Sequence, residues 1–185
     1  MGDLIVIEFV TLDGVVEDPD GSGGTAAGGW AFRHGPEAVA GDKFELGPLL
    51  DTGVMLFGRT TWELFGKIWP GRTDPFSAKM NAIPKLVASR TLSNTEAWQN
   101  SSLVEGDLVA AVRERKARQD VIVTGSVSLV HELGELVDEY RLMVFPTVVG
   151  RGQRLFTDRT PPTELRLTSV EQKGAAALMH YRKAG

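Results

Sequence analysis

The sequence predicts an α/β fold: a mixed, mainly parallel central sheet with flanking helices and an antiparallel hairpin at the carboxyl end. Three apolar runs each stop at a turn rich in glycine, hydroxyl or basic residues, and helix-like segments follow two of these turns. Near the end of the chain, two alternating runs on either side of Gly174 are typical of paired strands. Strands that interleave with helices and then give way to antiparallel strands define this class.

The stretch 54–63 is the clearest of the three turns. Four apolar residues lead to Gly58, and Arg59, Thr60 and Thr61 open a helix-like segment. A helix start offers unpaired N–H groups and the positive end of a dipole, which suit an anion. Glycine allows a close backbone approach, and arginine binds phosphate with a planar fork. We therefore expect a strand, a tight turn and a phosphate site here.

The same order recurs over 121–129. An apolar run stops at Gly125, Ser126 stands where a helix would begin, and Leu129 lies within the following segment. A second strand-to-helix turn of this kind indicates a second place where the backbone approaches a ligand closely.

A third apolar run, 85–88, ends in the basic and hydroxylated turn that contains Ser89 and Arg90. Arg59 and Arg90 could be ordinary surface residues, but each follows a strand directly and has hydroxyl neighbours, which favours phosphate binding. Three such strand ends fit an open α/β sheet that binds a nucleotide at its carboxyl edge.

The remaining elements follow from apolar periodicity and end signals. Further strands are expected over 4–11, 138–146, 165–170 and 177–182. Helices are expected to begin near Pro36, at Asp74 and at Asp107, and to span 129–136. The helix from Pro36 is expected to continue through an apolar face that reaches Leu50, and the basic residues that end the Asp107 helix, Lys116 among them, are assigned to a solvated face.

The segment 17–29 is too rich in glycine for a regular element. It is open to two interpretations: a floppy surface loop, or a mobile lid beside a binding site, since long loops in compact domains often act as lids.

Length and composition exclude several classes of protein. The 185 residues suit one domain, 1–185, and a hydrophobic content of 42% is ordinary for a soluble globular chain. A net charge of −4 argues against a nucleic-acid surface. Without cysteine there are no disulfides or thiolate metal sites. No run approaches the roughly 18 apolar residues of a membrane span, and no signal peptide is visible, so we expect a cytoplasmic protein without membrane contact.

Three familiar motifs are incomplete. The spacing from Gly53 to Gly58 resembles a P-loop, but the residues between them belong inside the strand. His131 begins a zinc-protease pattern that ends in Glu135 instead of histidine. The Ser126 region does not complete the nucleophile motif of hydrolases. The sequence therefore predicts no metal site, no nucleotide triphosphatase and no hydrolase.

The turn at 58–63 resembles the Gly-Arg-x-Thr-Trp/Tyr-Glu turn of the dihydrofolate reductase superfamily. Other motifs favour its bacterial branch related to the riboflavin-biosynthesis reductase domain, the RibD C-terminal domain. These motifs are 11–14, 89–92, 125–126 with Leu129, 136–142 and 146–156. They cover nearly the whole chain in the expected order.

The resemblance implies an NADPH-binding fold, a homodimer and a small-molecule substrate. It assigns the cofactor contacts to Asp13, Gly14, Gly58, Arg59, Thr60, Thr61, Ser89, Arg90, Gly125, Ser126 and Leu129. Asp13 and Gly14 would border the nicotinamide, and Ser89 and Arg90 would receive the 2′-phosphate. An additional dianion needs a guanidinium and a hydroxyl donor, which favours NADPH over NADH.

The resemblance has two departures. Riboflavin-pathway reductases carry a glutamate before a Gly-Gly pair, where this chain has Thr124 followed by Gly125 and Ser126. Dihydrofolate reductases carry a buried carboxylate five residues past a tryptophan, whereas counting from Trp30 reaches Gly35. The expected function is NADPH-dependent hydride transfer to a small heterocyclic or conjugated substrate. The alternatives are a non-catalytic nucleotide-binding module and a purely structural dimer.

Hydride transfer also needs a proton source. Asp13 is the first candidate, because it stands at a strand end near the expected nicotinamide; its alternative role is that of a plain turn residue before glycine. Glu37 is a second candidate, with a helix-start charge as its alternative role.

Aromatic residues can line a flat substrate pocket or fill the core. The candidates for substrate contact are Trp30, Phe44, Trp62 and Tyr140.

Overall fold

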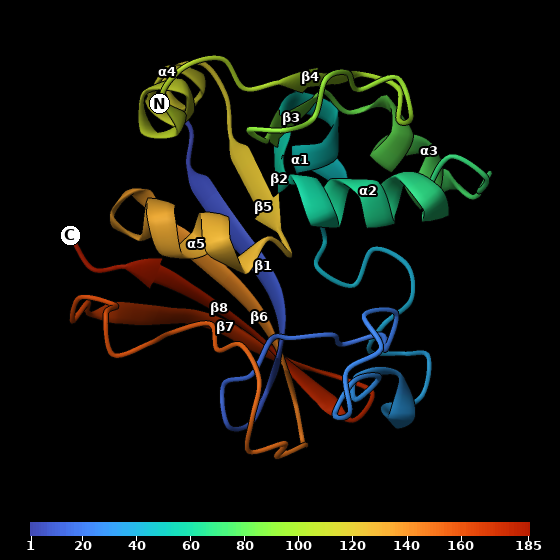
Figure 1. Cartoon of the computed structure of the whole chain (residues 1–185). Coiled ribbons are helices and arrows are strands. Elements are labelled where there is room, and N and C mark those ends of the chain that lie inside the picture. The colour runs from blue at the N-terminus through green and yellow to red at the C-terminus, as the bar shows by residue number, and fades with distance from the viewer.

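The computed structural model describes residues 1–185 and contains one eight-stranded sheet in the order β4-β3-β2-β5-β1-β6-β8-β7 (Figure 1). The strands are β1 Leu4–Thr11, β2 Val54–Gly58, β3 Lys85–Ala88, β4 Ser101–Leu103, β5 Val121–Thr124, β6 Glu139–Phe145, β7 Leu165–Lys173 and β8 Ala176–Lys183. Neighbours from β4 to β6 pair in parallel, and β8 pairs antiparallel with both β6 and β7. The predicted mixed sheet with its terminal hairpin is therefore confirmed.

Helices cover both faces of this sheet. They are α1 Gly47–Thr52, α2 Arg59–Ile68, α3 Pro75–Ala82, α4 Leu108–Lys116 and α5 Val127–Leu133, with short 3-10 turns η1 Phe32–His34 and η2 Gly134–Leu136. Buried residues of α1, α2 and α3 belong to one core cluster, and those of α4 and α5 belong to another. None of the helices combines the length and apolar character needed to cross a bilayer.

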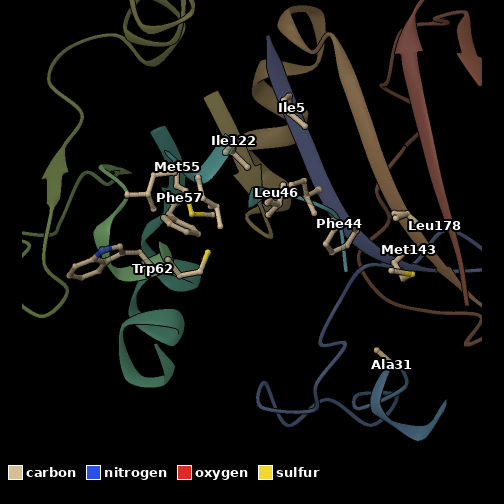
Figure 2. Close-up of a cluster of buried hydrophobic side chains, with 14 of the residues drawn as sticks. Ile5, Ala31, Phe44, Leu46, Met55, Phe57, Trp62, Ile122, Met143 and Leu178 are labelled. Atoms are coloured by element: carbon tan, nitrogen blue, oxygen red, sulfur yellow. The ribbon is translucent and has the colours of Figure 1, made fainter. Parts of the chain in front are cut away.

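The two clusters form core layers on opposite faces of the sheet. Successive strand residues point to opposite faces, so Ile5 and Ile7 of β1 join the first layer, while Leu4 and Val6 join the second. Figure 2 shows the first layer, in which strand residues meet Trp62 of α2. Continuous apolar runs are what strands covered on both faces require.

The helix expected from Pro36 does not form, and α1 begins only at Gly47. The intervening chain makes turns, in which Gly41 (φ +64°) and Glu45 (φ +56°) adopt the left-handed conformation. Left-handed residues cannot continue a right-handed helix. The apolar residues that suggested a helix face still reach the core, but from an irregular segment; Phe44 is one of them.

The helices expected from Asp74 and Asp107 are present as α3 and α4. Each aspartate accepts a hydrogen bond from the backbone three residues on, Asp74 from Ser77 (3.0 Å) and Asp107 from Ala110 (2.8 Å). These bonds satisfy N–H groups that have no partner within the helix.

Lys116 was assigned to the solvated face of α4, and this is wrong. Its side chain is only 10% exposed; Nζ donates to the Leu136 carbonyl (2.9 Å) and pairs with the Asp138 carboxylate. The paired carboxylate comes from the start of a distant strand, so helix periodicity alone could not reveal it.

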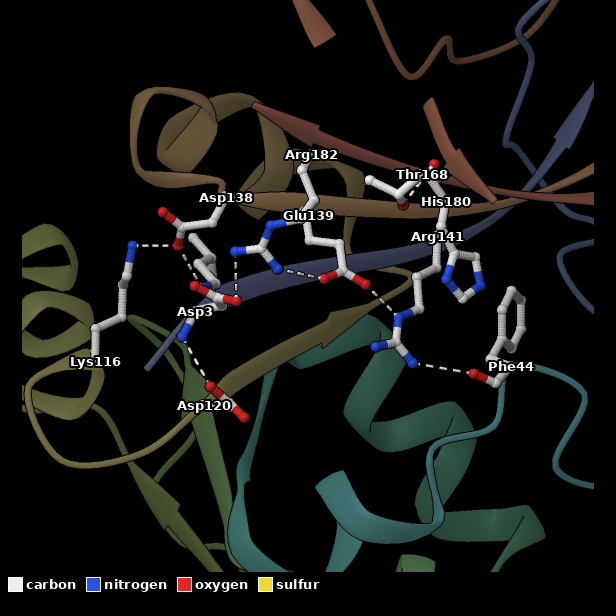
Figure 3. Close-up of polar contacts among 11 residues, drawn as sticks. Asp3, Phe44, Lys116, Asp120, Asp138, Glu139, Arg141, Thr168, His180 and Arg182 are labelled. Atoms are coloured by element: carbon white, nitrogen blue, oxygen red, sulfur yellow. Dashed lines mark hydrogen bonds and ion pairs between the residues drawn. The ribbon is translucent and has the colours of Figure 1, made fainter. Parts of the chain in front are cut away.

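Further charged residues form hydrogen bonds and ion pairs with one another at the amino ends of the parallel strands (Figure 3). Glu139 accepts from Arg141 Nε (2.6 Å) and from Arg182 Nη1 (2.8 Å), and Arg182 also pairs with Asp3 (2.8 Å). We call these four residues, with Lys116 and Asp138, the amino-end network. It joins β6 and β8 to the start of β1.

Candidate functional site

The candidate site lies where β2 and β5 are neighbours in the sheet. Trp62 of α2 packs into the first core layer, whereas Leu129 and Val130 of α5 pack into the second. The helices that follow these adjacent strands therefore lie on opposite faces. In open α/β sheets such a switch point forms a crevice at the carboxyl ends of the strands, where ligands bind. We call this place, bordered by the turns at residues 58–61 and 125–126, the switch crevice.

Two hydrogen bonds join the turns on either side of the switch crevice. The Gly58 N–H donates to Ser126 Oγ (2.9 Å), and the Ser126 N–H donates to Thr61 Oγ1 (3.1 Å). Gly125 (φ +63°) and Ser126 (φ +58°) are both left-handed. A Cβ on Gly125 would lie 2.9 Å from Thr61 Cγ2, so the close approach requires glycine.

The amino end of α2 presents unpaired donors to the switch crevice. Gly58 is its N-cap residue and makes no side-chain cap bond. The N–H groups of Arg59, Thr60 and Thr61 have no partner within the helix because they lie in its first turn. Together with the helix dipole they make a place for an anion.

The Arg59 guanidinium joins this helix start to the β3 turn. Its Nε pairs with Glu63 (2.8 Å), and its Nη1 donates to Thr91 Oγ1 (2.8 Å). The side chain is 49% exposed, so it borders solvent. The two arginine-bearing turns are therefore neighbours.

In the β3 turn, Ser89 Oγ accepts from the N–H groups of Thr91 (3.2 Å) and Leu92 (3.0 Å). These bonds use its lone pairs and leave the hydroxyl hydrogen free to donate. Arg90 is exposed beside it. The turn thus offers a hydroxyl donor and a guanidinium at the edge of the switch crevice.

The Asp13 carboxylate already has partners in the protein. It accepts from Thr11 Oγ1 (2.7 Å) and from the N–H groups of Gly150 (2.8 Å) and Val149 (3.2 Å). The Thr11 hydroxyl and the Gly150 N–H lower the pKa of Asp13 to about 2. An acid this strong is ionised near neutral pH and has no proton to give, so the geometry favours the turn role, here a tie between the β1 end and the 146–150 loop.

Glu37 is not brought to the switch crevice. It is exposed and lies beside the β7–β8 turn, where its Cβ would be 3.0 Å from a Cβ on Gly174. Since the expected helix is absent, its helix-start role is absent too.

The four candidate aromatic residues are not brought to one pocket. Trp30, Phe44 and Trp62 belong to the first core layer and Tyr140 to the second, and none is more than 7% exposed. Trp30 Nε1 donates to the Glu17 carbonyl (2.8 Å). All four are core residues in this structure.

The segment 17–29 is an ordered loop built on Asp18. The Asp18 carboxylate accepts from the Gly23 N–H (2.8 Å) and from both the N–H and hydroxyl of Thr25 (2.9 and 2.8 Å). Its carbonyl accepts from the N–H groups of Gly21 and Gly29. The loop is therefore not floppy in this structure.

Two titratable groups were missed by the sequence analysis. Glu8 is 5% exposed in the second half of β1, its Oε1 has no hydrogen-bond partner, and burial raises its pKa to about 8. The sequence signal for Glu8 was that it is the one charged residue within the apolar run of β1. Lys43 is half-buried, and desolvation lowers its pKa to about 8 while Asp42 opposes the shift. No sequence signal marked Lys43, because it lies in the irregular segment.

A cavity of about 540 Å³ lies away from the switch crevice, between residues 161–164 and the last residues of the chain. Its one lysine, Lys183, already donates to the Glu135 carbonyl (3.0 Å). This cavity is open and is lined mainly by proline, charged and small residues, so it lacks the apolar walls of a typical ligand site.

Comparisons with known proteins cover nearly the whole chain. The family model of the RibD C-terminal domain matches residues 3–179. The uncharacterized protein YyaP of Bacillus subtilis (strain 168) is 28% identical over 177 residues, which are 90% of this chain and 87% of that protein.

Two solved structures share the fold. A Shewanella sp. PV-4 protein assigned to riboflavin biosynthesis has a TM-score of 0.75 at 19% identity, covering 99% of each chain. Dihydrofolate reductase from Enterococcus faecalis, solved with NADP(H), has a TM-score of 0.56 at 14% identity, covering 100% of this chain and 98% of that one.

Proposed function

Because the chain belongs to the RibD C-terminal domain family, we propose that it is an NADPH-dependent reductase that transfers hydride to a small heterocyclic or conjugated substrate. The observation that carries this proposal is the contact between Arg59 and Thr91, which makes two phosphate-suited turns neighbours. A dinucleotide with an additional phosphate needs cationic donors at two nearby points.

The residues of the switch crevice fit such a cofactor. The α2 start, with Gly58, Arg59, Thr60 and Thr61, would hold a phosphate, and Ser89 with Arg90 would hold the 2′-phosphate. Gly125, Ser126 and Leu129 would border the diphosphate, and Asp13 with Gly14 the nicotinamide. Gly125 allows the two turns to lie close together, because a Cβ there would meet Thr61.

The nicotinamide would supply the hydride, and the protein would orient the acceptor and supply a proton. The tie between Asp13 and the 146–150 loop would fix the end of β1 under the reacting atoms. The buried positions of the four aromatic residues argue that the substrate is bound by other side chains.

We further propose that the chain forms a homodimer through its outer hairpin. Strand β7 lies at the edge of the sheet. Its Leu167 and Val170 are 47% and 61% exposed, and they pair with Tyr181 and Met179, which share one face of β8. Light scattering of a Val170→Lys variant should then give the monomer mass; a monomeric wild-type protein would contradict this part.

Titration with NADPH and NADH tests the main proposal. We expect NADPH to bind more tightly than NADH. Arg59→Ala and Arg90→Ala should each weaken NADPH binding by about tenfold or more, because each removes charge-assisted hydrogen bonds. Arg113→Ala, on the exposed side of α4, is the matched control and should bind as the wild type does. No NADPH binding, or equal binding of both dinucleotides, would count against the proposal.

The second candidate, a module that binds nucleotide without chemistry, is favoured because Asp13, the carboxyl candidate at the end of β1, is ionised near neutral pH and has no proton to give. It predicts NADPH binding without cofactor oxidation across pterins, flavin precursors and quinones. Turnover of any of these compounds would exclude it.

A further inference from the structure

We propose that Lys43 binds the acceptor atom of the substrate and gives it a proton. This inference rests on the proposed reductase function. Neither carboxyl candidate suits the task, because Asp13 is tied to the 146–150 loop and Glu37 lies beside the β7–β8 turn. Lys43 has the chemistry and the geometry that they lack.

The backbone around Lys43 is held firmly although it is not helical. The Asp42 carboxylate accepts from the N–H groups of Leu46 (2.7 Å) and Gly47 (2.9 Å). On the other side, Arg141 of the amino-end network donates to the Phe44 carbonyl (3.0 Å), as Figure 3 shows. Lys43 is therefore fixed at both neighbouring residues, which is the preorganisation that a proton donor needs.

The Lys43 ammonium lies against two aromatic rings with most of its donors free. Its Nζ is 5.0 Å from the ring centre of Phe9 and 5.4 Å from that of Phe44. It donates one hydrogen bond, to the Val39 carbonyl (3.1 Å). An ammonium has three donors, so two remain for a ligand.

The Lys43 ammonium lies against β1, the strand that leads to the proposed hydride site. Phe9 lies two residues before the end of β1 at Thr11, and Asp13 and Gly14 follow after one further residue. A strand rises about 3.3 Å per residue, so this ring is within about 15 Å of the residues proposed to border the nicotinamide. Phe9 and Phe44 stack at 5.9 Å with 27° between their planes, so the ammonium lies beside an aromatic pair at this part of β1.

The local electrostatics make the proton available. Burial lowers the pKa of Lys43 to about 8, and the carboxylate of Asp42 partly opposes this effect. Arg141, whose Nη1 donates to the Phe44 carbonyl, has its charge paired with Glu139. A donor with a pKa near the working pH is both protonated and able to release its proton.

The proton from Lys43 would complete a balanced two-electron reduction. A nicotinamide held by the switch crevice would supply a hydride to the acceptor carbon of a C=O, C=N or conjugated C=C bond, and the π electrons would move to the heteroatom at its end. That atom takes the proton from Lys43 Nζ. The products are the reduced substrate, the oxidised cofactor and a neutral amine, which regains a proton from water.

The test uses 2,4-dinitrophenolate, a flat oxyanion that resembles the charge formed on the acceptor, and its neutral ether 2,4-dinitroanisole. Binding of both is measured to the complex with NADP⁺. We expect Lys43→Met to weaken binding of the oxyanion by about tenfold or more, because a charge-assisted hydrogen bond is lost. Binding of the neutral ether should change little. Lys43→Arg should retain oxyanion binding, and Lys67→Met, an exposed lysine of α2, is the control.

Turnover separates binding from proton transfer. With any acceptor that is reduced, Lys43→Met and Lys43→Arg should both lower kcat by about a hundredfold, because a guanidinium keeps its proton. Both variants should bind NADPH as the wild type does. If oxyanion binding is absent in the wild type or unchanged in Lys43→Met, the Lys43 inference is wrong while the reductase proposal stands. If the wild type binds no NADPH, both fail.

Discussion

Buried charged side chains at the two ends of the parallel strands differ in whether they have hydrogen-bond partners. At the amino end, Lys85, Lys116 and Glu139 are buried, and each has hydrogen-bonded partners that occupy its donors or acceptors. The fourth buried charged residue, Glu8, lies in the second half of β1, and one of its oxygens has no partner. Charges that are fully paired hold a fold together, whereas unpaired ones remain available for a ligand or destabilise the fold.

Two lysines make the comparison sharper. Lys85 and Lys43 both lie against aromatic rings, and burial lowers the pKa of each to about 8. Lys85 Nζ donates to three carbonyls, those of Ile83 (2.7 Å), Asn81 (3.0 Å) and Gln99 (3.2 Å). Lys43 has one such bond. The same residue type is therefore a structural tie at one end of the sheet and a group with free donors at the other.

The largest expected effect concerns Glu8. Its pKa is raised on folding to about 8, so its stabilising contribution is complete below its ordinary value near 4.5 and is lost as the pH rises through 8. We expect wild-type unfolding free energy to fall by on the order of 4 kcal/mol over this range, and Glu8→Gln to remove most of that fall. Urea unfolding at several pH values measures it.

Glu105→Gln, at an exposed loop position, is the control for Glu8 and should keep the wild-type pH dependence. The same fall in stability in Glu8→Gln would mean that Glu8 is paired after all, and the contrast between the two ends would weaken.

The next effect separates the two lysines. Lys85→Met should lower the unfolding free energy by about 2–3 kcal/mol, because the buried carbonyl of Ile83 and the part-buried carbonyls of Asn81 and Gln99 lose a donor. Lys43→Met should change stability by less than about 1 kcal/mol, because it removes one hydrogen bond and a buried charge together. Equal losses in urea unfolding would show that both lysines are structural.

A smaller effect is expected at the switch crevice. Gly125→Ala places a Cβ 2.9 Å from Thr61 in a left-handed conformation, and should cost about 1–2 kcal/mol of stability. NADPH affinity should fall as well, since the two turns are pushed apart. Gly71→Ala, in open space, is the control for both measurements.

The smallest effect is expected at Asp13. Because its carboxylate already has three partners and its pKa is about 2, Asp13→Asn should leave kcat nearly unchanged, whereas loss of a catalytic acid costs about a hundredfold or more. The lowered pKa means that Asp13 stabilises the fold above its ordinary pKa and loses this contribution as the pH falls toward 2. A large loss of kcat would restore Asp13 as the proton donor.

Much of the fold was predictable because its signals are local. The apolar run of β1, the cap of α3 at Asp74 and the turn at Gly174 each lie within a few residues of the element that they define. The segment 35–46 was not predictable, since its apolar spacing resembles a helix. Left-handed residues such as Glu45 and the long-range bond from Arg141 to Phe44 decide its path instead.

The candidate site was predictable in part for the same reason. Gly58 and Gly125 end apolar runs, so the sequence indicated both turns, and the sheet order brings them together. The environment of Lys43 depends on Phe9, thirty-four residues earlier in the chain. The ties that occupy the Asp13 carboxylate likewise come from a loop more than a hundred residues away.

The Asp18 loop has a practical consequence for handling the protein. Five hydrogen bonds converge on Asp18. The glycines of the loop therefore cannot leave their positions one at a time, and the loop has to unfold as a unit. Proteases cut chains that can unravel over several residues. Resistance of this stretch to nicking, and its loss when ligands are added or withdrawn, would therefore report directly on whether the loop opens during a working cycle.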